Sequence, residues 1–191
     1  ILQAATAIFL KMGYHATSMD QIAKEAAVTK LTVYNHFQDK ANLFTCAIEE
    51  SCEESIRAKQ FELTPESDFR QALYLMCQRA LGVIYLPEAL KLDRVLFELA
   101  AEQSPLTQQF FDASHSRMGN VWCGFFEQAI TLNFIQADDP LKQTELIVAL
   151  MLGTRHHKVL LGLDSVPTTV EIKQMIEQAI ELFLLKYQPK F

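Results

Sequence analysis

Apolar residues recur at helical spacing along nearly the whole chain, and this periodicity is the strongest constraint on its fold. In the first turns, Ile1, Ala5, Ile8, Phe9 and Met12 follow one another at i, i+4, i+7, i+8 and i+11. Residues at this spacing lie on one side of an α-helix, and the glycine that follows them is typical of a helix C-cap. The pattern predicts an all-α protein.

Two short helices with clear start signals follow the first one. Ser18 is typical of an N-cap, and Gln21, three residues later, completes a capping box. Thr29 caps the next helix, with Val28 and Val33 at the two positions of a hydrophobic staple. The buried face of the helix that Ser18 starts is predicted to carry Met19, Ile22, Ala23 and Ala26.

Two short helices joined by a tight turn and stacked on a third form a helix-turn-helix, whose second helix lies in the major groove of DNA. Here that second helix falls within "VTKLTVYNHF", residues 28–37, and Asp39 then caps a longer fourth helix. Val33 and Phe37, at i and i+4, are expected to anchor the second helix to a small core. Its other faces carry Lys30, Leu31, Thr32, Tyr34 and Asn35.

Residues 1–44 resemble the DNA-binding domain of the TetR-type transcriptional regulators, the tetracycline repressor family. The resemblance rests on "AATAIF", the Gly-Tyr pair, Thr17, Ser18, Met19, Ile22, Ala23, Val28, Tyr34, His36, Phe37, Lys40, Leu43 and Phe44, all in order and at matching spacing. Three later stretches, "AAEQSPLTQQFF", "ADDP" and "AIELFLLKY", resemble more loosely the C-terminal domains of multidrug-efflux repressors. The resemblance implies an N-terminal three-helix DNA-binding domain over residues 1–44 and a helical effector-binding and dimerisation bundle over residues 45–191.

The predicted DNA contacts divide into two groups. We expect phosphate contacts from Thr17, Tyr34, His36 and Lys40, and base contacts from Lys30, Thr32 and Asn35. Lys30 suits the O6 and N7 atoms of guanine, Asn35 suits adenine, and the Thr32 methyl group suits the thymine methyl.

Two residues depart from the family pattern. Ala27 replaces the usual glycine of the turn, and we expect a small effect provided that the backbone there is not left-handed. Leu31 replaces a glycine early in the recognition helix, so it must either meet a thymine methyl group or hold the helix slightly away from the DNA.

Charge is distributed unevenly between the two parts. The chain has a formal net charge of -6, but residues 1–44 hold four lysines against three acidic residues. The excess acid lies outside the predicted DNA-binding part, which favours approach of the duplex to that part. With few lysines per subunit, the grip on phosphates should be modest and sensitive to salt.

The two C-terminal helical segments carry more apolar surface than one core contact requires. Leu182, Leu184 and Leu185 widen the apolar stripe of the last helix. Such a surface resembles the two-helix dimer face of the family, which forms a four-helix bundle across a twofold axis. The alternative, in which both faces are buried within one subunit, stays open. The interface is predicted to include Leu146, Leu150, Ile176, Ile180 and Phe183.

Aromatic residues gather in the middle of the chain. At helical spacing such residues belong more often to a core than to a ligand pocket. As a group, beside Glu98, Glu102 and Glu127, they suit a large apolar or cationic organic effector. We expect that effector to act on the DNA-binding domain through the fourth helix. The predicted pocket is lined by Tyr74, Phe97, Phe111, Trp122, Phe125 and Met151.

Other classes of protein find little support in the sequence. There is no glycine-rich phosphate loop, no H-E-x-x-H and no G-x-S-x-G motif, so we expect neither an enzyme nor a cofactor. The four cysteines and five histidines lack metal-site spacing, and we expect no metal, reduced thiols and a cytoplasmic protein. The longest apolar run, "LIVALML", is far below the roughly 20 residues that span a bilayer, so no membrane association is predicted.

The sequence therefore predicts a homodimeric, ligand-responsive transcriptional regulator. We expect a repressor that binds a palindromic, double-stranded operator and is released by an unknown small organic effector. A DNA-binding protein without an effector, acting in chromosome organisation or through a protein partner, shares the same first 44 residues and remains the alternative.

Overall fold

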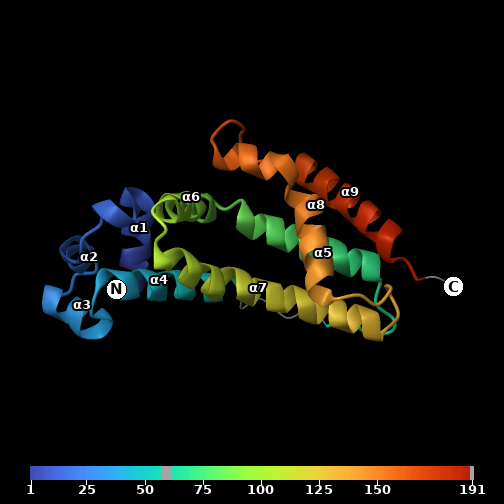
Figure 1. The fold of residues 1–191 in the computed structure, drawn as a ribbon, viewed down its shortest axis with the longest axis horizontal. Coiled ribbons are helices and arrows are strands. Elements are labelled where there is room, and N and C mark those ends of the chain that lie inside the picture. The colour runs from blue at the N-terminus through green and yellow to red at the C-terminus, as the bar shows by residue number, and fades with distance from the viewer. Residues whose placement is uncertain (57–61, 190–191) are drawn as a thin grey trace. The chain divides into compact units, whose positions relative to one another are not determined.

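The computed structural model describes residues 1–56 and 62–189, and every regular element in these residues is a helix (Figure 1). This confirms the predicted all-α fold with an N-terminal helix-turn-helix. The helices are α1 (Leu2–Ala16), α2 (Met19–Glu25), α3 (Lys30–Phe37), α4 (Lys40–Ile56), α5 (Phe69–Ile84), α6 (Pro87–Ala101), α7 (Pro105–Thr131), α8 (Pro140–Leu160) and α9 (Thr169–Tyr187).

The helices form two compact units. The first comprises Ile1–Ala58 and Pro87–Arg117, and the second comprises Lys59–Leu86 and Met118–Phe191. The boundary predicted after residue 44 falls inside α4 and inside the first unit. The compact unit extends beyond the predicted domain because α6, a later segment, packs on α1.

The interior of the first unit is built on aromatic contacts between α1 and α4. Phe9 of α1 is fully buried, and its ring meets Phe44 of α4 edge to face with 5.0 Å between centroids. Tyr14 stacks on Phe9 at 5.9 Å and meets the edge of Phe44 at 5.2 Å. Val33 of α3 and Leu99 of α6 belong to the same core. Val33 is the one fully buried side chain by which α3 packs into this core.

The start signals read from the sequence are confirmed by hydrogen bonds. Ser18 Oγ accepts from the Gln21 backbone N–H at 3.3 Å, while Gln21 Oε1 accepts from the Ser18 backbone N–H at 2.8 Å. Thr29 Oγ1 accepts from the Thr32 N–H at 3.1 Å, and Asp39 caps α4 by accepting from the Asn42 N–H at 2.8 Å. These caps satisfy N–H groups that a helix end leaves unpaired.

Two backbone positions differ from the sequence expectation. Gly13 does not end α1; it lies inside the helix with φ 79° and ψ 169°, and one further turn follows to Ala16. Ala27, in the turn between α2 and α3, has φ 53° and is therefore left-handed. Its Cβ makes this conformation unfavourable by roughly 1 kcal/mol or more, so the loss of glycine there is not neutral.

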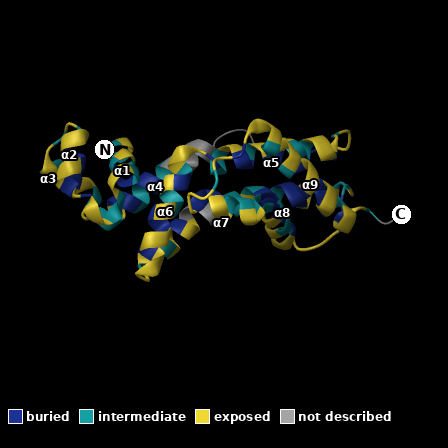
Figure 2. Cartoon of the chain, turned by 90° about the horizontal axis from the view of Figure 1, so that it is seen from above, coloured by how far each residue is buried: buried dark blue, intermediate teal, exposed yellow. Residues whose placement is uncertain are grey.

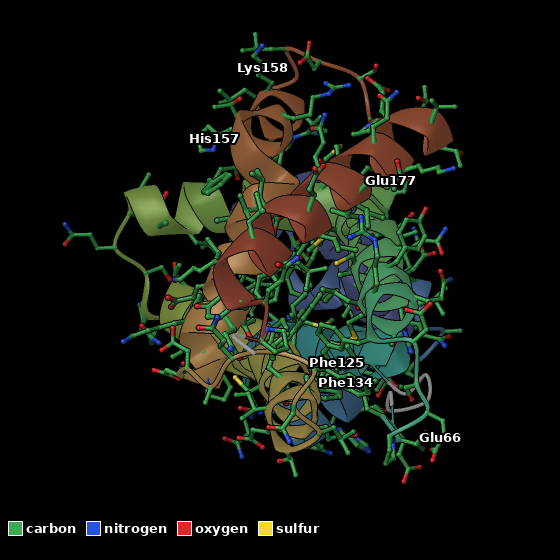
Figure 3. The ribbon with its side chains drawn as sticks, turned by 90° about the vertical axis from the view of Figure 1, so that its right-hand side faces the viewer. Glu66, Phe125, Phe134, His157, Lys158 and Glu177 are labelled. Atoms are coloured by element: carbon green, nitrogen blue, oxygen red, sulfur yellow. The ribbon has the colours of Figure 1, made fainter. Side chains whose placement is uncertain are left out.

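The second unit has a separate aromatic core. Phe126 of α7 stacks on Phe183 of α9 at 5.2 Å and on Trp122 at 5.9 Å. Phe69 of α5 stacks on both Phe125 and Phe134, at 5.8 and 5.6 Å, and Figure 3 labels the latter two. The helix α9 packs against both α5 and α8 and so covers this core.

Three residues predicted to lie in the dimer interface are buried inside the single chain. Ile176, Ile180 and Phe183 have exposed fractions of 0%, 1% and 0%, so they belong to the core of a single chain. The sequence correctly indicated an apolar stripe on α9, but the stripe faces the chain's own helices. Leu146 and Leu150 of α8 are half-buried.

Among residues 1–56 and 62–189, no helix combines the length and the apolar character needed to cross a lipid bilayer. In the same residues no three His, Cys, Asp or Glu side chains are grouped so that they hold a metal ion.

Restoring glycine in the turn tests the strain at Ala27. We expect Ala27→Gly to raise the free energy of unfolding by about 1 kcal/mol, because glycine adopts positive φ without a Cβ penalty. The neighbouring Ala26 has φ -76°, so Ala26→Gly should lower stability by about 0.5 to 1 kcal/mol. Urea unfolding followed by circular dichroism measures both. Equal effects of the two substitutions would contradict the assignment of strain to position 27.

Candidate nucleic-acid interface

The helix α3 presents a mostly exposed outer face. Figure 2 shows exposed residues over the outer sides of α2 and α3, with buried residues turned inward. Val33 is buried, whereas Leu31 is 68% exposed and Tyr34 is 40% exposed. Asn35 is also exposed. An apolar leucine among polar side chains at the start of a capped helix suits contact with the thymine methyl group in a major groove.

Lys30 lies at the first position of α3 and forms an ion pair with Asp20 of α2, with 2.7 Å between Nζ and Oδ1. Its Nζ also lies 5.7 Å from the centre of the Tyr34 ring. The hydrogen bond to Asp20 raises the pKa of Lys30, so the ammonium is charged at neutral pH. Because both partners are exposed, the pair contributes little to stability and is readily exchanged for another acceptor.

Two polar side chains of α3 are oriented by the helix itself. Thr32 Oγ1 lies 2.7 Å from Oγ1 of the capping Thr29. His36 Nδ1 lies 2.8 Å from the carbonyl oxygen of Thr32, and because a carbonyl only accepts, Nδ1 must donate. In a neutral ring Nε2 is then an acceptor, so His36 donates to a phosphate through Nε2 only when it is protonated.

Thr17 is placed differently from the sequence expectation. Its side chain is 2% exposed, and its Oγ1 donates to the carbonyl oxygen of Gly13 at 2.7 Å. The hydroxyl proton is therefore used inside the chain, where it caps the kinked end of α1. This geometry leaves the side chain no donor for a phosphate.

Lys40 also differs from the sequence expectation of a phosphate contact. Its Nζ donates to the carbonyl oxygens of Tyr14, His15 and Thr17 at 2.9, 3.4 and 3.0 Å. It lies 4.5 Å from the centre of the Tyr14 ring, and burial lowers its pKa. An ammonium has three donors, so these carbonyls occupy all of them. Lys40 thus ties the start of α4 to the end of α1.

Sequence reasoning did not identify the partners that position these cations. Asp20 holds Lys30, and Tyr14 supports Lys40 with its ring and its carbonyl oxygen. Tyr14 was part of the family resemblance, so its signal was present, but the contact spans 26 residues of sequence. Asn42 was also missed; its Nδ2 donates to the Phe37 carbonyl oxygen at 3.0 Å at the end of α3.

The six predicted pocket residues are divided between the two units, two in the first and four in the second. Phe97 and Phe111 belong to the first unit and are 54% and 53% exposed. Trp122, Phe125 and Met151 belong to the second unit and are buried. Tyr74, half-buried on α5, lines a polar hollow of about 720 Å³ between α5 and α9. Arg70 of α5 and Lys173 and Glu177 of α9 also line that hollow. Figure 3 labels Glu177.

Comparison with known proteins matches both parts of the chain to one family. Residues 1–45 match the family described as bacterial regulatory proteins of the tetR family. Residues 71–189, more than half of the chain, match the AefR-like transcriptional repressor C-terminal domain of the same group. The chain belongs to the TetR family of transcriptional regulators. The resemblance inferred from residues 1–44 is thereby confirmed.

Individual TetR relatives support this assignment. The HTH-type transcriptional activator FasR of Mycolicibacterium smegmatis is 34% identical over 73 residues, which are 38% of this chain and 33% of FasR. A solved TetR-family structure from Mesorhizobium loti has 27% identity and a TM-score of 0.88, covering 98% of this chain and 94% of that one. The flavonoid-responsive regulator FrrA has 28% identity and a TM-score of 0.81, covering 100% of this chain and 96% of that one. The stretches matched in the curated relatives span 21% to 43% of those proteins.

Replacing Lys40 separates its internal role from a DNA contact. We expect Lys40→Ala to lower the free energy of unfolding by about 1 to 3 kcal/mol, because three carbonyl groups lose a charged donor. The salt dependence of DNA affinity should be unchanged, whereas loss of a phosphate contact lowers the slope by about 1. Lys24→Ala, on the exposed side of α2, is the stability control and should be neutral. An unchanged stability together with a lower slope for Lys40→Ala would restore the phosphate assignment.

Proposed function

We propose that this protein is a dimeric repressor that binds a palindromic operator through α3 and is released when a small organic effector binds. The observation that carries the DNA-binding part is the exposed face of α3. It combines an exposed leucine with a lysine, an asparagine and a tyrosine on a helix whose N-terminus is capped by Thr29. The first domain of the TetR family, which matches this part of the chain, supports the same reading.

The roles of the α3 side chains follow from their exposure and partners. Lys30 and Asn35 are exposed and project hydrogen-bonding atoms, so they are assigned to base edges. Leu31, exposed beside Lys30, is assigned to a thymine methyl group. Tyr34 is assigned to a phosphate through its hydroxyl group, and His36 is assigned to a phosphate through Nε2–H in its protonated form. The hydroxyl group of Thr32 contacts Thr29, and its methyl group is assigned to a thymine methyl group in the major groove.

The base-reading role of Lys30 is tested by selecting bound fragments from a pool of random duplex DNA. We expect a palindromic consensus whose half-sites lie about one helical turn apart or slightly more. Lys30→Ala should relax the preference at one symmetric position, with a loss of roughly 1 to 3 kcal/mol on the selected operator. Lys24→Ala, on the exposed side of α2, is the matched control and should retain the preference. Equal losses for Lys30→Ala on operator and random DNA would remove Lys30 from the base-reading set.

The dimer part of the proposal rests on apolar side chains that remain exposed on α8 and α9. Leu182 and Leu185 are 53% and 68% exposed on the outer side of α9, and Leu141 of α8 is 51% exposed. Leu146 and Leu150 are half-buried on α8. Apolar surface of this kind marks an interaction site, and a twofold dimer buries the same face of both copies.

Charge substitutions on α9 distinguish interface from core. We expect Leu185→Glu to produce a folded monomer, because the side chain is 68% exposed in the single chain. Phe183→Glu should instead unfold the second unit, because that position is 0% exposed. Gln178→Glu, at an exposed polar position of α9, is the control and should remain dimeric. Sedimentation velocity and circular dichroism measure these outcomes. A stable wild-type monomer at micromolar concentration contradicts the dimer.

The effector part rests on the aromatic core of the second unit and on a relative. FrrA is flavonoid-responsive and is 28% identical to this chain. In this core Trp122 stacks on Phe126 and Phe125 stacks on Phe69, and such surfaces suit an apolar ring system. None of the three acidic residues expected to favour a cation is buried in this core: Glu98 and Glu127 are exposed, and Glu102 pairs with His15 at 2.9 Å. We therefore propose an apolar rather than a cationic effector.

Trp122 is the single tryptophan of the chain, so its emission reports on this core. Because Trp122 is 1% exposed, an effector that enters between these rings should change its emission, and the same compounds should release the operator. A coupling of about 1 to 3 kcal/mol gives a 5- to 150-fold loss of operator affinity. If a broad panel of apolar compounds changes neither Trp122 emission nor DNA binding, the effector-free DNA-binding alternative takes the place of this proposal.

A further inference from the structure

Two polar side chains of the second unit meet where α5 ends and α8 bends. Tyr85 is the C-cap of α5 and is 6% exposed. His156 lies on α8 just after Gly153, where φ 46° and ψ -153° kink the helix. The two rings meet edge to face, with 5.5 Å between their centroids. His157, the next residue, is exposed and lies on the outer side of α8 in Figure 3.

Both side chains bury a polar atom without a partner. Among the residues that the structure describes, neither Tyr85 Oη nor His156 Nδ1 makes a hydrogen bond, and both atoms are shielded from solvent. Most buried polar atoms in folded proteins are paired, and an unpaired one loses its hydration without compensation. Two such atoms on rings in contact with each other form a pair of unused hydrogen-bonding positions inside the second unit.

The cationic side chain of Arg155, next to this pair, is paired with carboxylates, and the two rings themselves are neutral. Arg155, next to His156, forms ion pairs with Asp164 at 2.9 Å and with Glu171 at 3.4 Å. Its charge is therefore offset by two carboxylates. Burial lowers the pKa of His156 and raises the pKa of Tyr85, so both rings are neutral at physiological pH. A neutral polar group fits these surroundings better than an ion does.

We propose that Tyr85 Oη and His156 Nδ1 form a subsite that binds a neutral hydroxyl group of an apolar ring compound. A hydroxyl group both donates and accepts, so it pairs with Tyr85 and with either tautomer of His156. This inference rests on the proposed function, because it names the polar group by which the effector is recognised. It assigns the effector to the hydroxylated apolar ring compounds.

The test uses flavone and 7-hydroxyflavone, which share one apolar ring system and differ by a single hydroxyl group. Their affinities for the full chain are measured by Trp122 emission and by calorimetry. The wild type should bind the hydroxylated compound at least roughly 10-fold more tightly, since a site built to hydrogen-bond a hydroxyl discriminates against its absence. Tyr85→Phe should bring the ratio close to one and leave the affinity for flavone unchanged.

Three further variants separate a binding role from a structural one. His156→Asn keeps a hydrogen-bonding atom near the position of Nδ1 and should retain part of the preference, whereas His156→Leu should lose it. Tyr187→Phe is the matched control, because Tyr187 is also buried but its hydroxyl donates to Asp138 at 2.9 Å. Without ligand, Tyr187→Phe should lower Tm, and Tyr85→Phe should leave it unchanged or raise it.

Several results overturn the subsite. For the wild type, these results are equal affinities for the two compounds or no binding of either compound. For Tyr85→Phe, they are a preference for the hydroxylated compound that remains, or a fall in Tm as large as that of Tyr187→Phe. If both compounds release the selected operator equally well, the subsite is wrong and the repressor function stands. If the wild type binds no duplex DNA, the proposed function is wrong whatever the compounds do.

Discussion

The geometry of the DNA-binding part depends on one aromatic contact, the edge-to-face packing of Phe9 on Phe44. Phe9 lies on α1 and Phe44 on α4, so this contact joins the helices that precede and follow α2 and α3. Tyr14 covers both rings, and Lys40 closes the arrangement by donating to three carbonyl groups at the end of α1. Because α3 itself buries little, its orientation is determined by these neighbours.

Polar side chains at two places in the described residues are central to the proposals: those exposed on α3 in the first unit, and the buried pair Tyr85 and His156 in the second. In the first unit the start of each short helix is capped, and the polar side chains of α3 are left exposed. In the core of the second unit, Phe126 stacks on Trp122 and on Phe183, and Phe183 contacts Tyr187 at a tilted angle, while Tyr85 and His156 keep buried polar atoms unpaired. Native proteins break local rules of this kind mostly at functional sites.

Local signals predicted local structure well. The caps Ser18, Thr29 and Asp39 and the buried Val33 follow from a few neighbouring residues, and so does the helix-turn-helix. Long-range contacts were not predictable in this way: the sequence does not state that Lys40 reaches the end of α1, or that α6 joins the first unit. An amphipathic stripe identifies a buried face but not its neighbour, so Ile176, Ile180 and Phe183 were assigned to a partner chain although the structure buries them in their own. The small effect expected for Ala27 depended on a backbone that is not left-handed, and its positive φ shows that this condition is not met, because the turn geometry and not the alanine sets that angle.

The central claim is that the effector and the operator favour different conformations of the protein, so that binding of one lowers the affinity for the other. Thermodynamic linkage makes this coupling reciprocal, so the operator must weaken effector binding by the same factor by which the effector weakens operator binding. The direct measurement is the affinity of the full chain for an effector that releases the operator, determined with and without saturating operator duplex. The account predicts a loss of about 5- to 150-fold when the duplex is present, equal to the loss measured in the opposite direction. An effector affinity that is the same with and without the duplex would contradict it.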